Sequence, residues 1–171
     1  MIAESFPPIA SPAATVLLLG SMPGVESLRQ NAYYAHPRNA FWPIMSQLLG
    51  FDEDAPYAER VAALVGAGIA LWDVLRTCER PGSLDARIVD ASIVVNNFAT
   101  FLARHPHIRR VYFNGARAEQ EYRKRVMSGL PEPLRALPWQ RLPSTSPAMA
   151  SLSFNQKLAV WRDFAAELKR P

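Results

Sequence analysis

The chain has 171 residues, 49% hydrophobic and 20% charged, which is enough apolar material for one domain core and excludes a disordered chain. Its longest apolar stretch, residues 61–72, is too short to span a bilayer. No Lys or Arg precedes Arg29, so the basic start of a signal peptide is missing. The single cysteine, Cys78, cannot form an internal disulfide, and alone it cannot hold a zinc ion or an iron–sulfur cluster. The net charge of +4 divides into −4 over residues 1–103 and +8 over residues 104–171. We therefore expect one cytoplasmic domain, residues 1–171, nucleoid-associated if bacterial.

Strands and helices alternate along the sequence. The expected strands are short, nearly continuous apolar runs, typical of a parallel sheet buried on both faces: residues 15–20, 68–73, 92–96, 110–114 and 140–143. Segments with apolar residues at helical spacing lie between and after them: residues 41–49, 56–65, 98–104, 116–126 and 154–168. The alternation predicts an α/β layered domain, whose chemistry gathers in the loops beyond the carboxyl ends of the strands.

The first of these loops carries two motifs. Gly20-Ser-Met-Pro-Gly24 lets backbone N–H groups face a cleft, although small residues around Pro-Gly are also common in plain turns. Tyr33-Tyr-Ala-His-Pro-Arg-Asn-Ala-Phe-Trp42 follows just before a predicted helix. Tyrosine can stack on a base and Asn offers a fixed donor and acceptor, but Asn39 can equally cap the helix, with Phe41 and Trp42 in the core.

These two motifs, followed by Leu142-Pro-Ser-Thr-Ser-Pro147, resemble the uracil-DNA glycosylase superfamily, and within it the hypoxanthine-DNA glycosylase branch. Residues 68–75, 82–85 and 113–115 are also similar to this branch, so the resemblance covers about residues 16–161. It implies a three-layer α/β/α sandwich with a central, mostly parallel sheet of four to five strands. It also implies a DNA glycosylase that removes deaminated bases, hypoxanthine or uracil, and starts base excision repair.

The chain departs from the family pattern in three places. Met22 stands where the mismatch-specific relatives have a catalytic Asn, and the loop lacks the Asp of the classical uracil enzymes. No His lies near Leu142-Pro-Ser, and the iron–sulfur branches need four cysteines where this chain has one. The resemblance therefore shifts the catalytic role to Asn39, which follows His-Pro.

The resemblance also implies roles for other residues. Tyr34 would stack on the flipped base or pack beneath the loop, and the N–H groups of Ser21 and Met22, after Gly20, would contact a carbonyl of that base. Asn114 would read the base or serve as a turn residue. Asp73 and Asp85 are open as second catalytic groups, caps or arginine partners.

The remaining expected contacts are with DNA. Short hydroxyls suit phosphate, and a long apolar side chain can fill the gap left by a flipped base; these roles fall to Ser144, Thr145, Ser146 and Met149, with Arg38 beside them. Because 16 of the 19 basic residues are Arg, the basic C-terminal half suggests a polyanion partner or, equally, a solvated surface. Within that half, Arg141 and Lys157 are the first candidates to bind DNA.

The sequence thus predicts a monomeric, monofunctional DNA glycosylase with no metal, no iron–sulfur cluster, no cofactor and no membrane contact. None of its three lysines lies in a motif loop, where a lyase would need a nucleophile. Met22 and the missing His motivate an alternative, a module of the same fold that binds damaged DNA or a flipped base without cleaving. A weaker third hypothesis is an enzyme acting on free nucleotides or phosphosugars.

Overall fold

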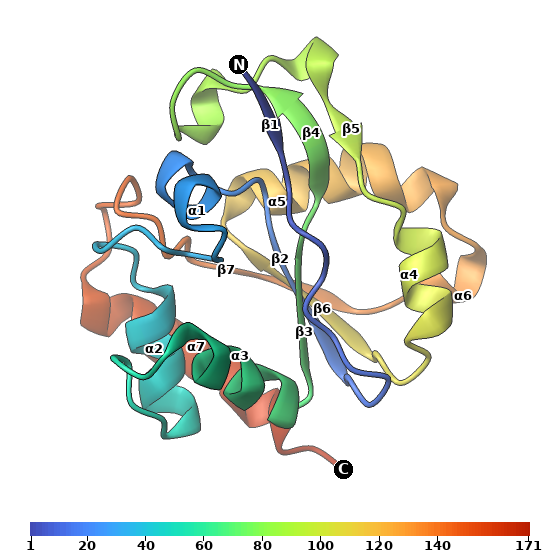
Figure 1. Cartoon of the computed structure of the whole chain (residues 1–171). Helices are drawn as coiled ribbons and strands as arrows, with labels where there is room; N and C mark the ends of the chain where they lie inside the picture. Colours follow the sequence, from blue (N-terminus) through green and yellow to red (C-terminus); the bar gives the residue numbers. More distant parts are fainter.

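A computed structural model describes residues 1–171. Its centre is a parallel sheet of four strands in the order β3-β2-β6-β7 (Figure 1). The strands are β2 (Val16–Gly20), β3 (Ile69–Asp73), β6 (Arg110–Asn114) and β7 (Trp139–Leu142). β2 lies in the middle, where Leu18 is level with Leu71 of β3 and with Tyr112 of β6. The predicted parallel sheet is confirmed.

Helices cover both faces of this sheet and make three layers (Figure 1). One face packs against α2 (Phe41–Leu49), α3 (Tyr57–Gly66) and α7 (Phe154–Leu168), and the other against α4 (Phe98–Arg104) and α5 (Ala116–Glu121), which continues as a π-helical turn over Tyr122–Val126. Successive side chains of a strand point to opposite faces, so Leu17 and Leu19 of β2 enter one core whereas Val16 and Leu18 enter the other.

A second, antiparallel sheet was not expected. It consists of β1 (Ile2–Glu4), β4 (Leu75–Glu79) and β5 (Val94–Val95), in the order β1-β4-β5. Residues 92–96 were expected to join the central sheet, and that expectation is wrong. Only Val74 separates β3 from β4, so the chain passes from the central sheet directly into the second sheet. The next strand, β5, then pairs with β4 and not with a strand of the central sheet. An apolar run predicts a strand but does not predict which other strand it pairs with.

Shorter elements fill the connections. The loop after β2 contains α1 (Val25–Gln30), and α6 (Glu132–Arg135) precedes β7. Single 3₁₀ turns lie at Asp85–Arg87, Asp90–Ser92 and Met127–Gly129. None of the helices has the length and apolar character needed to cross a bilayer.

Candidate active site

A cavity opens beyond the ends of β2 and β6, two neighbouring strands whose following helices lie on opposite faces of the sheet. The chain leaves β2 toward α2 on one face, whereas β6 leads into α5 on the other. In open α/β sheets such a point leaves a crevice beyond the carboxyl ends of the strands. Here that crevice is a cavity of about 810 Å³.

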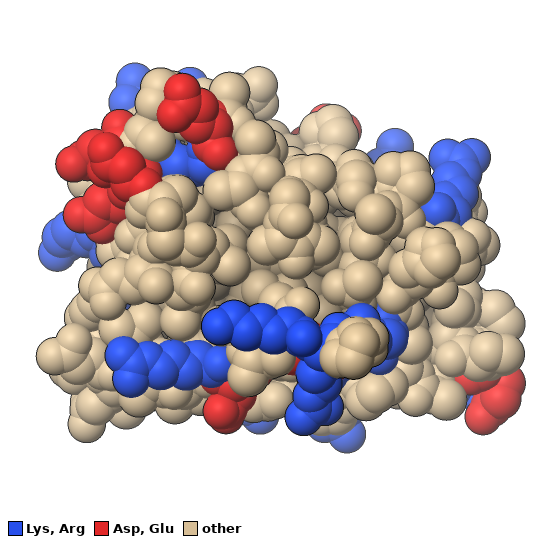
Figure 2. Space-filling model, turned by 90° about the horizontal axis from the view of Figure 1, so that it is seen from below, with Lys and Arg blue, Asp and Glu red and all other residues tan.

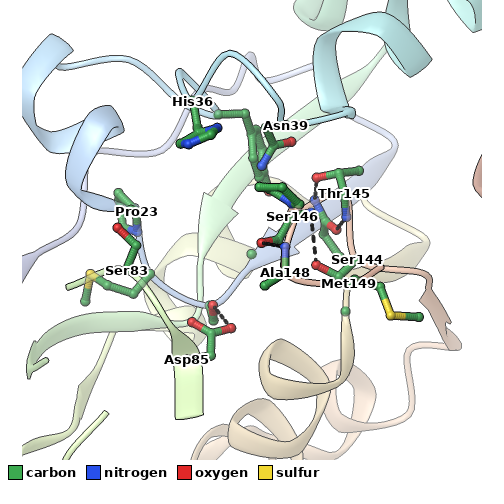
Figure 3. Close-up of a pocket in the computed structure, with 18 of the residues that line it drawn as sticks. Pro23, His36, Asn39, Ser83, Asp85, Ser144, Thr145, Ser146, Ala148 and Met149 are labelled. Atoms are coloured by element: carbon green, nitrogen blue, oxygen red, sulfur yellow. Dashed lines mark hydrogen bonds between the residues drawn. The ribbon is translucent and has the colours of Figure 1, made fainter. Parts of the chain in front are cut away.

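Eleven of the residues that the sequence proposed for the site line this cavity, whereas Lys157 does not. Figure 3 shows His36 and Asn39 at one end, the loop of Ser144, Thr145 and Ser146 on one side and Pro23 with Asp85 on the other. The eleven residues are Gly20, Ser21, Met22, Tyr34, Arg38, Asn39, Asn114, Ser144, Thr145, Ser146 and Met149. Three parts of the chain that are far apart in sequence, within residues 20–39, at Asn114 and at residues 144–149, thus meet at one place.

The loop after β2 turns its carbonyl groups away from the cavity. The Gly20 and Ser21 carbonyls accept hydrogen bonds from the N–H groups of Val74 (2.9 Å) and Leu75 (3.1 Å). The buried Arg80 donates to the Pro23 carbonyl and, at 3.5 Å, to that of Met22. The N–H groups of Ser21 and Met22 donate to no acceptor in the chain, which leaves two peptide donors at the cavity wall.

Met22 itself points into the protein. Its side chain is 6% exposed and packs in the core on the α4 and α5 side of the sheet. At this position only the backbone can act on a ligand.

Asn39 is held in one orientation. Its side-chain Oδ1 accepts a hydrogen bond from the N–H of Phe41 at 3.0 Å, in the first turn of α2. The side-chain N–H₂ group donates to no acceptor in the chain. The expectation that Asn39 is the N-cap is wrong, because Ala40 occupies that position and Asn39 precedes it. Its oxygen still serves the first helical residue, and its amide donors remain free for a functional role.

The two tyrosines have different surroundings. Tyr33 is buried and donates its hydroxyl to the Pro7 carbonyl at 3.1 Å, so it belongs to the core. Tyr34 adopts a positive φ of 54°, which side chains other than glycine rarely adopt. One face of its ring stacks on Phe41, with centroids 4.0 Å apart, and its buried hydroxyl has no partner.

Asn114 and Thr145 bind each other reciprocally. The Asn114 amide donates to the Thr145 hydroxyl and accepts from the Thr145 N–H, both at 2.9 Å. Thr145 is 1% exposed, so its side chain holds the loop to the end of β6 and does not reach the surface as a phosphate contact would require. Gly115 follows with φ 93°, and a methyl group there would lie 3.0 Å from Cβ of Ser144.

The loop over residues 144–149 also meets the loop that carries Asn39. The N–H of Ala40 donates to the Thr145 carbonyl at 2.9 Å, which ties the two together. Ser144 and Ser146 are half-buried at the cavity wall, and Met149 lies at its rim, where its sulfur accepts a hydrogen bond from the Ser151 hydroxyl.

Three further charged groups, Asp85, Asp73 and Arg80, lie at the site, and the sequence left the roles of the two aspartates open. Asp85 accepts a hydrogen bond from the Ser21 hydroxyl at 2.7 Å. Asp73 ends β3, is 3% exposed and lines the cavity. Arg80 was not foreseen; the only sequence signal is an arginine placed between a predicted strand and Pro-Gly, which does not indicate burial.

The basic residues of the C-terminal half are mostly engaged elsewhere. Arg109, Arg110 and Arg170 surround the buried Glu167, at the end of the sheet where β6 begins. Figure 2 views the molecule from that end and shows Lys and Arg side chains along one edge. This group therefore lies away from the cavity.

Of the basic residues singled out near the motifs, two line the cavity. Arg38 is exposed there, and Arg141 pairs with the buried Glu119. Lys157 is 5% exposed, donates to the Ser146 carbonyl at 3.3 Å, and lies in a neighbouring groove. Burial lowers the pKa of Lys157.

Comparison with known proteins supplies the family. The profile of the uracil DNA glycosylase superfamily matches residues 7–165. The chain belongs to this superfamily. It is therefore a DNA glycosylase, in agreement with the prediction from its motifs.

Two proteins of similar sequence and one solved structure of similar fold belong to the genus Methanosarcina. A protein of Methanosarcina barkeri named hypoxanthine DNA glycosylase is 36% identical over 116 residues, covering 67% of this chain and 72% of the relative. A protein of the same name from Methanosarcina acetivorans is 35% identical over 119 residues, covering 69% and 74%. The solution structure of a Methanosarcina acetivorans protein provisionally named a uracil DNA glycosylase superposes with a TM-score of 0.81 at 30% identity, covering 99% of this chain and 100% of the other.

Proposed function

We propose that this glycosylase removes deaminated bases, hypoxanthine or uracil, from DNA by hydrolysing the N-glycosidic bond of a flipped nucleotide. One observation carries the proposal: the unpaired N–H groups of Ser21 and Met22 and the free amide donors of Asn39 line one cavity. Donors without acceptors at a cavity wall suit a ligand that gains negative charge. The names of the two Methanosarcina relatives favour hypoxanthine.

The chemistry explains why donors matter. A base inside a duplex must first be flipped out, at a cost of about a few kcal/mol that is least for a mispaired base. As the bond to the sugar breaks, the sugar gains positive charge and the base gains negative charge. Preorganised donors at the developing negative charge lower that barrier, with each donor contributing about 10²–10³ in rate.

The cavity residues then take the following roles. Asn39 donates to the reacting groups, since its oxygen is bound to the Phe41 N–H. Tyr34 presents the ring face that is not stacked on Phe41 to the base. Asn114 has one amide hydrogen left for the base after its two bonds to Thr145.

The DNA backbone would be bound at the rim. Ser144 and Ser146 offer hydroxyls to phosphates, Arg38 offers charge, and Met149 would fill the space left by the base. Thr145 would act by holding Asn114 rather than by touching DNA, because it is buried. No lysine lines the cavity, which supports a monofunctional enzyme that leaves an abasic site.

The alternative is a module that binds a flipped base without cleaving it. The burial of Met22 favours this alternative, because the side chain at a position that is catalytic in similar proteins cannot reach a ligand. The two candidates differ in whether Asn39 acts on a reacting bond.

The deciding experiment is base release from duplexes that carry one deoxyinosine or one uracil, with alkali added to reveal abasic sites. We expect strand breakage only after alkali, and a rate about 10²–10³ lower in Asn39→Ala. Asn155→Ala, at an exposed position of α7, is the matched control and should cleave as the wild type does. Binding of both duplexes without base release by the wild type would favour the binding module instead.

A further inference from the structure

The cavity holds a buried carboxyl group that has no partner in the chain. Asp73 stands at the carboxyl end of β3, 3% exposed, and its Oδ2 has no hydrogen-bond partner. The Tyr34 hydroxyl, also buried and unpartnered, lies beside it: a methyl group placed on Gly20 would be 2.6 Å from Asp73 Oδ1 and 2.9 Å from that hydroxyl. Two polar groups without partners thus face one small space next to Gly20.

No side chain forms a hydrogen bond or an ion pair with the Asp73 carboxyl. Arg80 favours its ionised form only through its charge, because its N–H groups donate to the carbonyls of Met22, Pro23 and Gly82. The Asn96 amide donates to the main-chain carbonyl of Asp73, at 2.8 Å, and not to its carboxyl.

The other titratable groups around it are Tyr33 and Tyr34 on the loop before α2, Asp85 in the segment after β4, and His36 at the cavity wall. Burial, together with the negative charge of Asp85, raises the pKa of Asp73 to about 7, against the opposing effect of Arg80. At neutral pH a large fraction of the enzyme therefore carries Asp73 as a carboxylic acid, which has a proton to donate.

We propose that Asp73 is a general acid that protonates the departing base, and that this makes the cavity a purine site. The inference rests on the proposed function. A purine linked through N9 keeps two ring nitrogens with lone pairs, N3 and N7, whereas uracil linked through N1 keeps none, because its N3 carries hydrogen. A proton on N3 or N7 lets hypoxanthine leave as a neutral molecule.

The step balances in atoms and charge. The bond between C1′ and N9 breaks and its electron pair stays with the base, while the Asp73 proton passes to the ring nitrogen. Water adds to C1′ and releases a proton to solvent, from which the Asp73 carboxylate is protonated again. The sum is hypoxanthine and an abasic site from deoxyinosine and one water.

The test measures single-turnover release of hypoxanthine from a deoxyinosine duplex between pH 5.5 and 9. The wild-type rate should fall about tenfold per pH unit above a midpoint near the pKa of Asp73, about 7. Asp73→Asn, which keeps the shape but cannot give up a proton in this range, should be about 10²–10⁴ slower at pH 6 and should lose that slope. His36→Gln is the matched control, because it replaces another side chain at the cavity wall and leaves Asp73 in place, and it should keep the slope.

A second measurement changes the substrate instead of the pH. Deoxyinosine analogues with carbon in place of N3 or of N7 remove one acceptor each, and with the accepting nitrogen gone the rates of the wild type and Asp73→Asn should converge. If hypoxanthine is released with the same pH profile by both proteins, and both analogues preserve the rate ratio, Asp73 is not the acid while the glycosylase stands. If the wild type releases no base from any duplex, the proposed function fails and this inference fails with it.

Discussion

The stability of the fold should report the protonation of Asp73 independently of catalysis. An aspartate in an unfolded chain has a pKa of about 3.9, whereas burial raises the pKa of Asp73 to about 7 in the folded protein. Between these two values the folded state holds a proton that the unfolded state has lost. The contribution of Asp73 to stability is therefore complete below about pH 4, falls as pH rises toward 7, and is lost above it.

The size of this effect follows from the difference between the pKa of Asp73 in the unfolded and in the folded protein, which sets the width of the pH window. Each pKa unit corresponds to about 1.4 kcal/mol, so the whole window is worth about 4 kcal/mol, of which about 3 kcal/mol falls between pH 5 and pH 8. Asp73→Asn removes the titration and keeps the shape. For a chain of this size 1 kcal/mol corresponds to about 2–4 °C in the unfolding temperature. The unfolding temperature of Asp73→Asn minus that of the wild type should therefore increase by about 6–12 °C when the pH is raised from 5 to 8.

The assay is thermal unfolding followed by circular dichroism at matched ionic strength, for both proteins at each pH. All other ionisable groups are the same in both proteins, so their effects cancel in the difference to first order. If the two midpoints run parallel from pH 5 to pH 8, Asp73 is ionised throughout that range in the folded protein, and the assignment of an acid in the cavity is refuted.

Two further substitutions test the packing of the site. Gly20→Ala should lower base release by at least about tenfold and cost about 1–3 kcal/mol, because the added methyl group would lie 2.6 Å from Asp73 Oδ1; Gly66→Ala, where the added methyl meets nothing within 4 Å, is the control, and equal activity of the two would contradict the geometry. Thr145→Val should cost about 1–3 kcal/mol in urea unfolding by leaving the buried Asn114 amide short of an acceptor, and an unchanged unfolding midpoint would show that the pair is not a structural tie.

Most of the central fold could be predicted from local pattern. Helix periodicity placed residues 41–49, 98–104 and 154–168 at the bounds of α2, α4 and α7, because their apolar stripes face the sheet. The apolar runs at 15–20 and 110–114 are buried on both faces, as continuous hydrophobic runs favour. The antiparallel sheet was missed because pairing of β1 with β4 joins residues more than seventy positions apart, and no local pattern records it.

The lining of the cavity could be predicted from the sequence as a set of residues but not as a set of contacts. Motif spacing and the resemblance named eleven residues, and the structure brings all of them to one cavity. They did not reveal that Thr145 binds Asn114, that Arg80 holds the carbonyls of the β2 loop, or that Asp73 lacks a partner. These contacts depend on which buried polar groups form hydrogen bonds with each other. The partners are far apart in the sequence, so tertiary packing determines the pairs and local sequence patterns do not.

The burial of Met22 connects these observations into one account of catalysis. With that side chain in the core, the β2 loop contributes only peptide N–H groups, held outward because Arg80 and the start of β4 occupy its carbonyls. Peptide donors stabilise a negative base but cannot hand it a proton. Asn39 is a neutral amide with the same restriction. Among the carboxyl groups of the cavity, Asp73 is the one that is both buried and free of hydrogen-bond partners, so we expect a leaving group that must be protonated to receive its proton there. A purine can accept that proton on the ring, and this is the physical reason to expect hypoxanthine rather than uracil as the preferred base.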